Sequence, residues 1–185
     1  LVTLNKVLEQ DETFGIGMNG EITAVTFGLY AQEDITAADG SIIPADGLLE
    51  IVSVDENGQA MCKTDLPFGS FYLKELSTDS HYLPSGETFP FTFEYGGPSV
   101  AVVEINANDG EAISNELIRG EIRGMKTDEN GTGLSGAVIG LFQSDETEFT
   151  AENALATATS AEDGAFSFSD VPFGNWVLKE LESPE

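Results

Sequence analysis

The chain has 185 residues, of which 33 are acidic and 7 are basic, so its formal net charge is −26. Proteins that bind the phosphate backbone of nucleic acids need a basic surface, and this composition excludes that role. Apolar residues make up 41% of the sequence, which is enough for packed cores. No apolar run approaches membrane-spanning length, and Cys62 is the only cysteine, so we expect neither membrane insertion nor an internal disulfide.

In chain order, the predicted elements are mostly short strands separated by Gly, Asp and Asn turns. We expect them near residues 2–8, 25–31, 48–54, 69–76, 89–95, 100–105 and 112–117, with equivalents in the C-terminal part. Two short helical insertions are predicted, at Asp145–Leu155, where acidic residues occupy the first turn, and near Ile35–Ala38. Short strands with regular turns are typical of an antiparallel β-sandwich.

A repeated motif organises the sequence. Residues 66–76, LPFGSFYLKEL, return as residues 171–181, VPFGNWVLKEL. Residues 25–34, VTFGLYAQED, likewise match residues 137–146, AVIGLFQSDE. Internal repetition of this kind predicts two tandem modules, which we place at residues 1–117 and 118–185.

Each copy of the motif directs a carboxylate toward the core. Side chains alternate between the two faces of a strand, so Glu75 lies on the face of Phe71 and Leu73, and Glu180 repeats the pattern. Burying a carboxylate is costly unless it is neutral or partnered. Lys6 and Asn115 also lie on apolar faces, those of the first and last strands of the first module. The pattern therefore predicts a polar cluster inside an apolar core.

The sequence resembles the Cna B-type module, the transthyretin-like (prealbumin-like) sandwich of Gram-positive pilins and adhesins that includes the SpaA-type pilins. The resemblance rests on a strand lysine, a GLY or GLF strand, a DG-type turn, an L/V-P-F-G turn and the LKE strand, in that order. It covers the first module and all but the end of the second. It implies two tandem sandwich modules, the second of which lacks its final strand within these residues.

In the family that this chain resembles, a lysine of the first strand condenses with an asparagine of the last strand, and a glutamate promotes the reaction. Matched by position, Lys6 is the lysine, Glu75 the glutamate and Asn115 the acceptor. In the second module Lys126 and Glu180 match the lysine and the glutamate. No acceptor follows them in this sequence, so we expect Lys126 to remain an amine that pairs with Glu180 in the core.

The chemistry of these residue types agrees with that implication. An apolar pocket lowers the pKa of a lysine and leaves a neutral, nucleophilic amine. A protonated glutamic acid can hydrogen-bond to the amide oxygen, and it can also shuttle a proton to the departing ammonia. The competing interpretations are a lysine that extends to solvent at a sheet edge and a buried Lys–Glu ion pair without a bond. Asn106 and Asn108 are rival acceptors. Both are less favoured than Asn115, because Asn106 falls on the opposite strand face from Val103 and Ile105, and Asn108 lies in the NANDG turn.

Other candidate sites carry little signal. His81 is the only histidine, which excludes histidine-based triads and multi-histidine zinc sites. Cys62 is expected to be a packed or half-exposed residue without a special role. The acidic turn at Asp128–Gly131 lacks the spacing of an EF-hand, and we expect neither a metal nor a cofactor. The sequon at residues 130–132 is interpreted as a turn.

The favoured function is a structural stalk or backbone module of a cell-surface adhesin or pilus, locked by its own isopeptide bond. We expect an extracellular, cell-wall-attached protein whose anchor signal lies outside these residues, and whose partners are the neighbouring modules of the same polypeptide. An alternative is a ligand-binding module for host protein or glycan, which exposed aromatic residues at one end of the sandwich would support. A carboxylate-based hydrolase needs two acids facing a cleft, which nothing in the spacing suggests, so we do not expect an enzyme.

Overall fold

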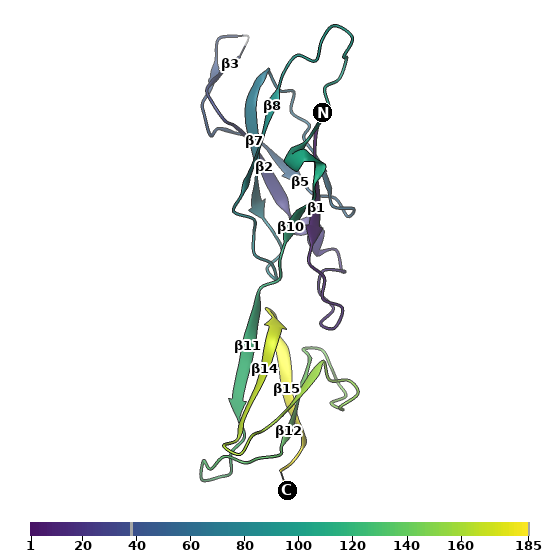
Figure 1. The fold of residues 1–185 in the computed structure, drawn as a ribbon, viewed down its shortest axis with the longest axis vertical. Helices are drawn as coiled ribbons and strands as arrows, with labels where there is room; N and C mark the ends of the chain where they lie inside the picture. Colours follow the sequence, from purple (N-terminus) through teal and green to yellow (C-terminus); the bar gives the residue numbers. More distant parts are fainter. Residues whose placement is uncertain (38, 185) are drawn as a thin grey trace. The chain divides into compact units, whose positions relative to one another are not determined.

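The computed structural model describes residues 1–37 and 39–184 of a mostly β protein. The chain forms two compact units (Figure 1). The first contains Leu1–Gln10 and Ile16–Glu116, and the second contains Asp11–Gly15 and the chain from Leu117 onward. Among the described residues, no helix has the length and apolar character needed to cross a membrane.

The first unit has two main sheets whose inner faces share one core. One sheet has the order β10-β1-β6, with β9 also paired to β1, and the other has the order β5-β2-β7-β8. The strands are β1 (Val2–Leu8), β2 (Thr26–Ala31), β5 (Leu48–Ser53), β6 (Gln59–Met61), β7 (Gly69–Ser77), β8 (Thr88–Phe93), β9 (Ile105–Asn106) and β10 (Ile113–Asn115). A small hairpin pairs β3 (Ile35–Thr36) with β4 (Ile42–Ile43).

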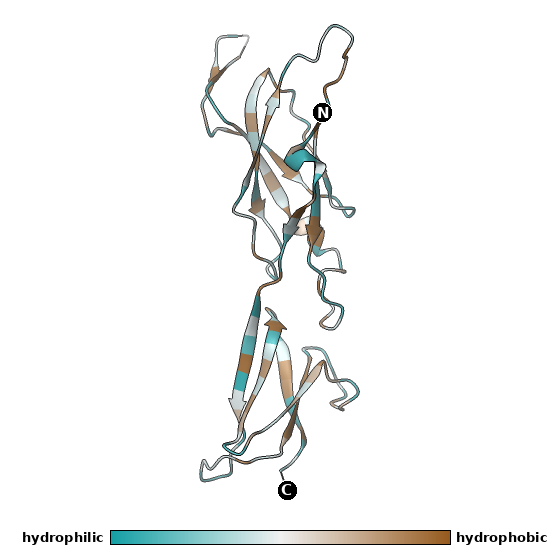
Figure 2. Cartoon of the chain, viewed as in Figure 1, coloured by the Kyte–Doolittle hydropathy of each residue, from teal (hydrophilic) through white to brown (hydrophobic). Residues whose placement is uncertain are grey.

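The core of the first unit follows the alternation that the sequence predicts. Phe27 and Leu29 of β2 and Phe71 and Leu73 of β7 are fully buried. Figure 2 shows these strands as alternating apolar and polar bands, as expected for sheets with one buried face. β1 pairs antiparallel with β6 and parallel with β10, so the first and last strands of the unit lie side by side.

The second unit repeats the central part of this arrangement. β11 (Arg119–Met125) pairs with β14 (Ala165–Pro172), and β12 (Val138–Gln143) lies between β13 (Ala156–Thr159) and β15 (Trp176–Glu182). Its smaller core is formed by Ala137, Ile139, Leu141, Phe168 and Val171. Within the described residues, β11 pairs with no strand except β14, and β15 with none except β12.

The shared G-L-Y and G-L-F triplets have a structural explanation. The ring of Tyr30 lies over Gly28, where an added Cβ would be 2.5 Å from the nearest ring carbon. Gly140 and Phe142 repeat the arrangement at the same distance of 2.5 Å. A side chain at either glycine would displace the ring, so the glycine is required for the aromatic residue to fold back over the strand.

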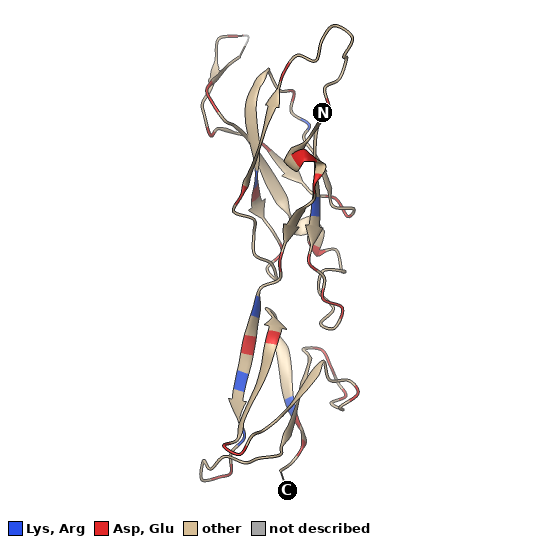
Figure 3. Cartoon of the chain, in the orientation of Figure 1, with Lys and Arg blue, Asp and Glu red and all other residues tan. Residues whose placement is uncertain are grey.

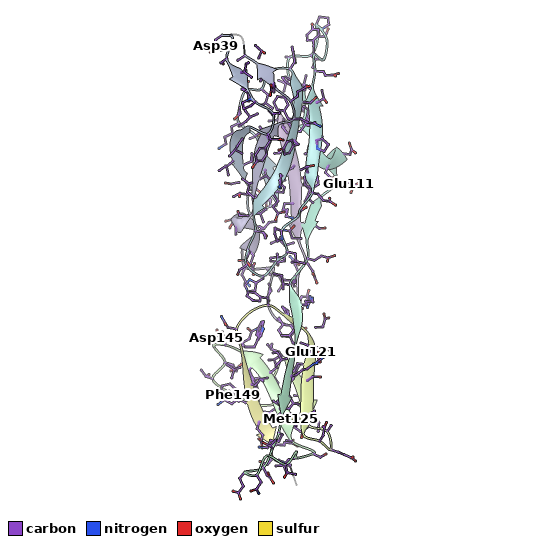
Figure 4. All side chains as sticks on the ribbon, turned by 90° about the vertical axis from the view of Figure 1, so that its left-hand side faces the viewer. Asp39, Glu111, Glu121, Met125, Asp145 and Phe149 are labelled. Carbon is purple, nitrogen blue, oxygen red and sulfur yellow. The ribbon has the colours of Figure 1, made fainter. Side chains whose placement is uncertain are left out.

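The predicted helices are wrong. Residues 145–155 form turns and irregular backbone, in which Glu146 Oε1 accepts hydrogen bonds from the backbone N–H groups of Thr147 and Glu148. Phe149 of this loop (labelled in Figure 4) packs edge-to-face on buried Phe142, with ring centroids 5.1 Å apart. This tertiary contact and the local side-chain bonds outweigh the helical preference.

The other predicted helical turn is also absent where the structure describes it, since Ile35–Thr36 is a strand and Ala38 lies outside the described residues. The helical insertions that do occur are two 3-10 turns, η1 (Glu21–Ala24) and η2 (Ala107–Gly110). η1 follows Gly20, and η2 contains Asn108. Both residues have a positive φ, which interrupts the extended backbone of a strand.

The strand predicted at residues 100–105 is largely wrong. Only Ile105–Asn106 is a strand, and residues 98–103 form a loop in which Val102 is 62% exposed. The preceding strand, predicted at residues 89–95, ends at Phe93, and Tyr95 beyond it is 67% exposed. The Gly96-Gly97-Pro98 turn accounts for the difference, because Gly97 takes a φ of 104°, which ends regular pairing.

A short segment early in the chain belongs to the second unit. Phe14 packs edge-to-face on Trp176, with ring centroids 5.0 Å apart, and its carbonyl accepts a 2.9 Å hydrogen bond from Gln143 Nε2. Asp11 Oδ2 accepts a 2.9 Å hydrogen bond from Arg119 Nη1. The core of the second unit is therefore completed by residues that precede it by about a hundred positions in sequence.

We expect Phe14→Ala to destabilise the second unit by about 1–2 kcal/mol, because a partly buried ring and its contact with Trp176 are lost. Trp176 is the only tryptophan, so its fluorescence during urea unfolding reports this unit. Phe173→Ala is the matched control, because Phe173 lies in the same unit and is 56% exposed. Equal midpoints for both variants would contradict the structural role of Phe14.

Candidate functional site: a buried lysine, glutamate and asparagine

Three strands bring the predicted cluster together. Lys6 lies on β1 and Asn115 on the adjacent parallel strand β10, in a register that places Lys6 opposite Ile113 and Leu8 opposite Asn115. Glu75 reaches them from β7 in the facing sheet. Lys6, Glu75 and Asn115 are only 2%, 5% and 2% exposed, although polar residues of these types are rarely buried.

The three side chains contact one another directly. Lys6 Nζ donates a 2.6 Å hydrogen bond to Asn115 Oδ1 and lies 3.2 Å from Glu75 Oε2. Asn115 Nδ2 donates a 2.6 Å hydrogen bond to Glu75 Oε1. The amine, the amide and the carboxylate thus form a closed triangle in which each group contacts both of the others.

The orientation of the amide differs from one expectation. Glu75 faces the nitrogen of the Asn115 amide and not its oxygen, so the geometry fits proton transfer to a leaving nitrogen better than stabilisation of an oxyanion. Glu75 Oε2 is buried without a hydrogen bond, although it lies within ion-pair distance of Lys6 Nζ. A buried acceptor in this position can take a proton from the amine after a small movement.

Burial controls the charge on the lysine. Removal of water lowers the pKa of Lys6, and the nearby Glu75 carboxylate offsets this only in part. The effect favours the neutral amine, which is the nucleophilic form. Basic residues are few in Figure 3, and acidic ones lie mainly on loops and turns. Lys6 is the one basic residue of β1, and it is buried.

A glycine turn holds the lysine backbone in both units. Lys6 N donates a 2.6 Å hydrogen bond to the carbonyl of Gly58, and a Cβ on Gly58 would be 2.2 Å from the Lys6 carbonyl oxygen. The same relation joins Lys126 to Gly164, with distances of 2.8 Å and 2.2 Å. The DG-type turns predicted from the sequence therefore fix the lysine strands, which makes Lys126 the structural counterpart of Lys6.

Lys126 and Glu180 meet, but not in a core. Lys126 Nζ lies 2.5 Å from Glu180 Oε2, and the two side chains are 27% and 30% exposed. The hydrogen bond from Lys126 lowers the pKa of Glu180, as expected for an ionised partner. The predicted burial of this pair is wrong. Alternation predicts which side chains share a face of β15, but it does not predict whether other residues cover that face, and Leu178 on it is 38% exposed.

The rival acceptors lie elsewhere. Asn106 Oδ1 accepts a 2.9 Å hydrogen bond from the hydroxyl of half-buried Thr3, and Asn108 Nδ2 donates to the carbonyl of Glu111. His81 pairs with Asp79 at 2.5 Å outside the cluster. Burial raises the pKa of Cys62 to about 12, so this thiol is not a nucleophile near neutral pH. Within residues 1–37 and 39–184 no group of acidic, histidine or cysteine side chains is arranged to hold a metal.

Sequence reasoning missed one residue of the cluster. Thr78 Oγ1 accepts a 3.1 Å hydrogen bond from Asn115 Nδ2. Thr78 follows the last residue of β7, where period-two alternation no longer predicts direction. A signal does exist, because the spacing Glu75-x-x-Thr78 returns as Glu180-x-x-Ser183.

Comparison with known proteins agrees with the fold and with the resemblance. Residues 120–185 match the model of the SpaA prealbumin-like fold domain. This part of the chain has the SpaA-type prealbumin-like fold. No protein with a curated description matches the chain.

Solved structures extend the likeness to the whole length. The Bacillus anthracis TIE protein superposes with a TM-score of 0.66 at 20% identity over 99% of this chain, which spans 28% of that protein. A C-terminal fragment of the pilus adhesin SpaC from Lactobacillus rhamnosus GG gives a TM-score of 0.54 at 13% identity, covering 99% of this chain and 76% of the fragment. At such identities the comparisons establish a shared fold.

Proposed function

We propose that this chain is a structural stalk or backbone segment of a Gram-positive cell-surface adhesin or pilus, locked by an isopeptide bond between Lys6 and Asn115. The observation that carries the proposal is the contact of Lys6 Nζ with the amide of Asn115, beside Glu75, in a core from which water is excluded. The SpaA-type fold of residues 120–185 and the likeness to a pilus adhesin support the cellular context.

The proposed reaction is a single-turnover amide exchange. Lys6 Nζ gives a proton to Glu75 Oε2 and attacks the amide carbon of Asn115, forming the C–N bond. Glu75 returns a proton to Nδ2, the bond between Cγ and Nδ2 breaks, and ammonia leaves. No oxidant, cofactor or external nucleophile is consumed, and the packed core supplies the effective concentration that makes the exchange feasible.

The bond would have a mechanical role. Lys6 and Asn115 lie on adjacent first and last strands of the unit, 109 positions apart in sequence. Force that enters through β1 and leaves through β10 would pass through the covalent bond and not through the hydrogen bonds of the sheets. Such a path suits a surface protein whose neighbouring modules transmit tension.

We expect the folded chain to weigh one ammonia less than its sequence, and a peptide digest to contain Lys6 joined to Asn115. The loss should be of one ammonia and not two, because Lys126 contacts Glu180 in the structure and not an asparagine. Intact-mass measurement checks both statements. Glu75→Gln should give a folded chain of full mass, because the proton acceptor is gone. Full mass in the folded wild-type chain would overturn the proposal.

We expect loss of the bond to lower the melting temperature of the first unit by roughly 20 °C. In the chain-entropy model, closing a loop of this length stabilises by about 4–5 kcal/mol. Lys6→Met and Glu75→Gln remove the bond in different ways and should lose similar stability in thermal scans. Lys74→Met is the control, because Lys74 is an exposed lysine on β7. Wild-type melting of both unbonded variants would show that the bond does not stabilise the first unit.

A second candidate function is binding of a host protein or glycan, and an aromatic group supports it. Phe68 and Tyr95 are 60% and 67% exposed. Phe68 also packs against Phe93, with ring centroids 5.1 Å apart, and lies 6.4 Å from Tyr95. Three neighbouring rings with two of them exposed are typical of a contact surface, whereas a plain stalk does not require them.

If these rings bind a ligand, Phe68→Ala with Tyr95→Ala should abolish adhesion of the purified chain to immobilised extracellular-matrix proteins or glycans. Phe173→Ala, which removes the equivalent exposed ring of the second LPFG-type turn, serves as the matched control. Adhesion that is absent in the wild type, or unchanged in the double variant, would leave the stalk as the sole function of this unit.

A further inference from the structure

The hydroxyl of Thr78 contacts the same amide nitrogen that Glu75 contacts. Thr78 Oγ1 and Glu75 Oε1 accept hydrogen bonds of 3.1 Å and 2.6 Å from Asn115 Nδ2. A primary amide nitrogen carries two hydrogens, so these two acceptors occupy its full donor capacity. The amide oxygen remains for Lys6 Nζ at 2.6 Å.

This arrangement fixes the amide in its plane. If the Asn115 side chain turned over, Oδ1 would face the Glu75 carboxylate, and two acceptors would oppose each other. Glu75 therefore selects the orientation of the Asn115 amide. Thr78 accepts the second hydrogen of Nδ2, and this additional hydrogen bond opposes rotation of the amide plane. Thr78 is partly buried, where an unmade hydrogen bond is costly.

The second unit has a hydroxyl residue in the same place. Thr78 is the first residue after β7 and Ser183 the first after β15, each three positions beyond the strand glutamate. Besides the stronger effect of Lys126, a hydrogen bond from Ser183 lowers the pKa of Glu180. In the second unit, where no amide is present, this hydroxyl bonds to the strand glutamate itself.

We propose that Thr78 is a positioning residue for formation of the Lys6–Asn115 bond, holding the amide nitrogen that leaves. This inference rests on the proposed isopeptide function. While Lys6 Nζ attacks the amide carbon, Thr78 and Glu75 keep Nδ2 on the opposite side from the amine. As Nδ2 takes up the proton from Glu75 and departs as ammonia, the Thr78 hydroxyl still accepts one of its hydrogens, so no hydrogen bond is lost during the step.

The test is the rate of bond formation. The full chain is made by a short pulse of cell-free synthesis, samples are quenched in denaturant at intervals, and loss of one ammonia is followed by intact mass. We expect Thr78→Val, which keeps the shape without the hydroxyl, to form the bond about tenfold more slowly. Thr78→Ser keeps the hydroxyl and should react within about twofold of the wild type. Thr92→Val on β8 is the matched control at an exposed threonine.

The pH profile separates positioning from proton transfer. The Thr78 hydroxyl does not titrate in the accessible range, so Thr78→Val should slow the reaction by the same factor at every pH. Glu75→Gln should abolish the reaction at every pH. Circular dichroism of each chain shows whether it has folded, and Thr78→Ala takes the place of Thr78→Val if the valine variant does not fold.

Each outcome decides the matter. A wild-type rate in Thr78→Val would overturn the role of Thr78 and leave the isopeptide proposal intact. Equal slowing in Thr78→Ser and Thr78→Val would show that the methyl packing and not the hydroxyl matters, which also overturns it. A folded wild-type chain that never loses ammonia overturns both proposals.

Discussion

The buried contact among Lys6, Glu75 and Asn115 is the interaction on which the architecture of the first unit depends. An amine, a carboxylate and an amide lie together where exposure is at most 5%. Removing any one of them would leave each of the other two with one partner fewer in a medium that solvates it poorly, at a cost of several kcal/mol. The first strand, the last strand and the facing sheet are therefore tied to one another through polar groups as well as through apolar packing.

The second unit has the same sequence elements, but its lysine and glutamate are not enclosed in a core. Its lysine strand, glycine turn and glutamate strand reproduce the backbone relations of the first unit, including the hydrogen bond from Lys126 N to the Gly164 carbonyl. Lys126 and Glu180 still meet, but in a partly exposed ion pair. Such a pair contributes little to stability because water already solvates both charges. The difference between the buried cluster of the first unit and the ordinary ion pair of the second is therefore the surrounding layer of structure.

Chain connectivity also departs from a simple row of modules. The segment Asp11–Gly15 leaves the first unit after β1 and completes the core of the second, where Phe14 covers Trp176. Each unit thus depends on residues distant in sequence: the first on the parallel pairing of β1 with β10, and the second on this segment. Contacts of such long sequence separation make the fold cooperative within each unit, and they form only after large loops have closed.

The β class, the repeat and the inward face of the key strands can be predicted from the sequence alone, because alternation and turn residues act locally. Lys6, Glu75 and Asn115 could be placed on core-facing positions since period two specifies a face. Which groups touch depends on the tertiary structure: Glu75 faces the amide nitrogen, Thr78 contacts the same nitrogen, and Phe149 packs on Phe142 in place of a predicted helix. Those outcomes depend on distances between strands that lie far apart along the chain, and no local pattern encodes them.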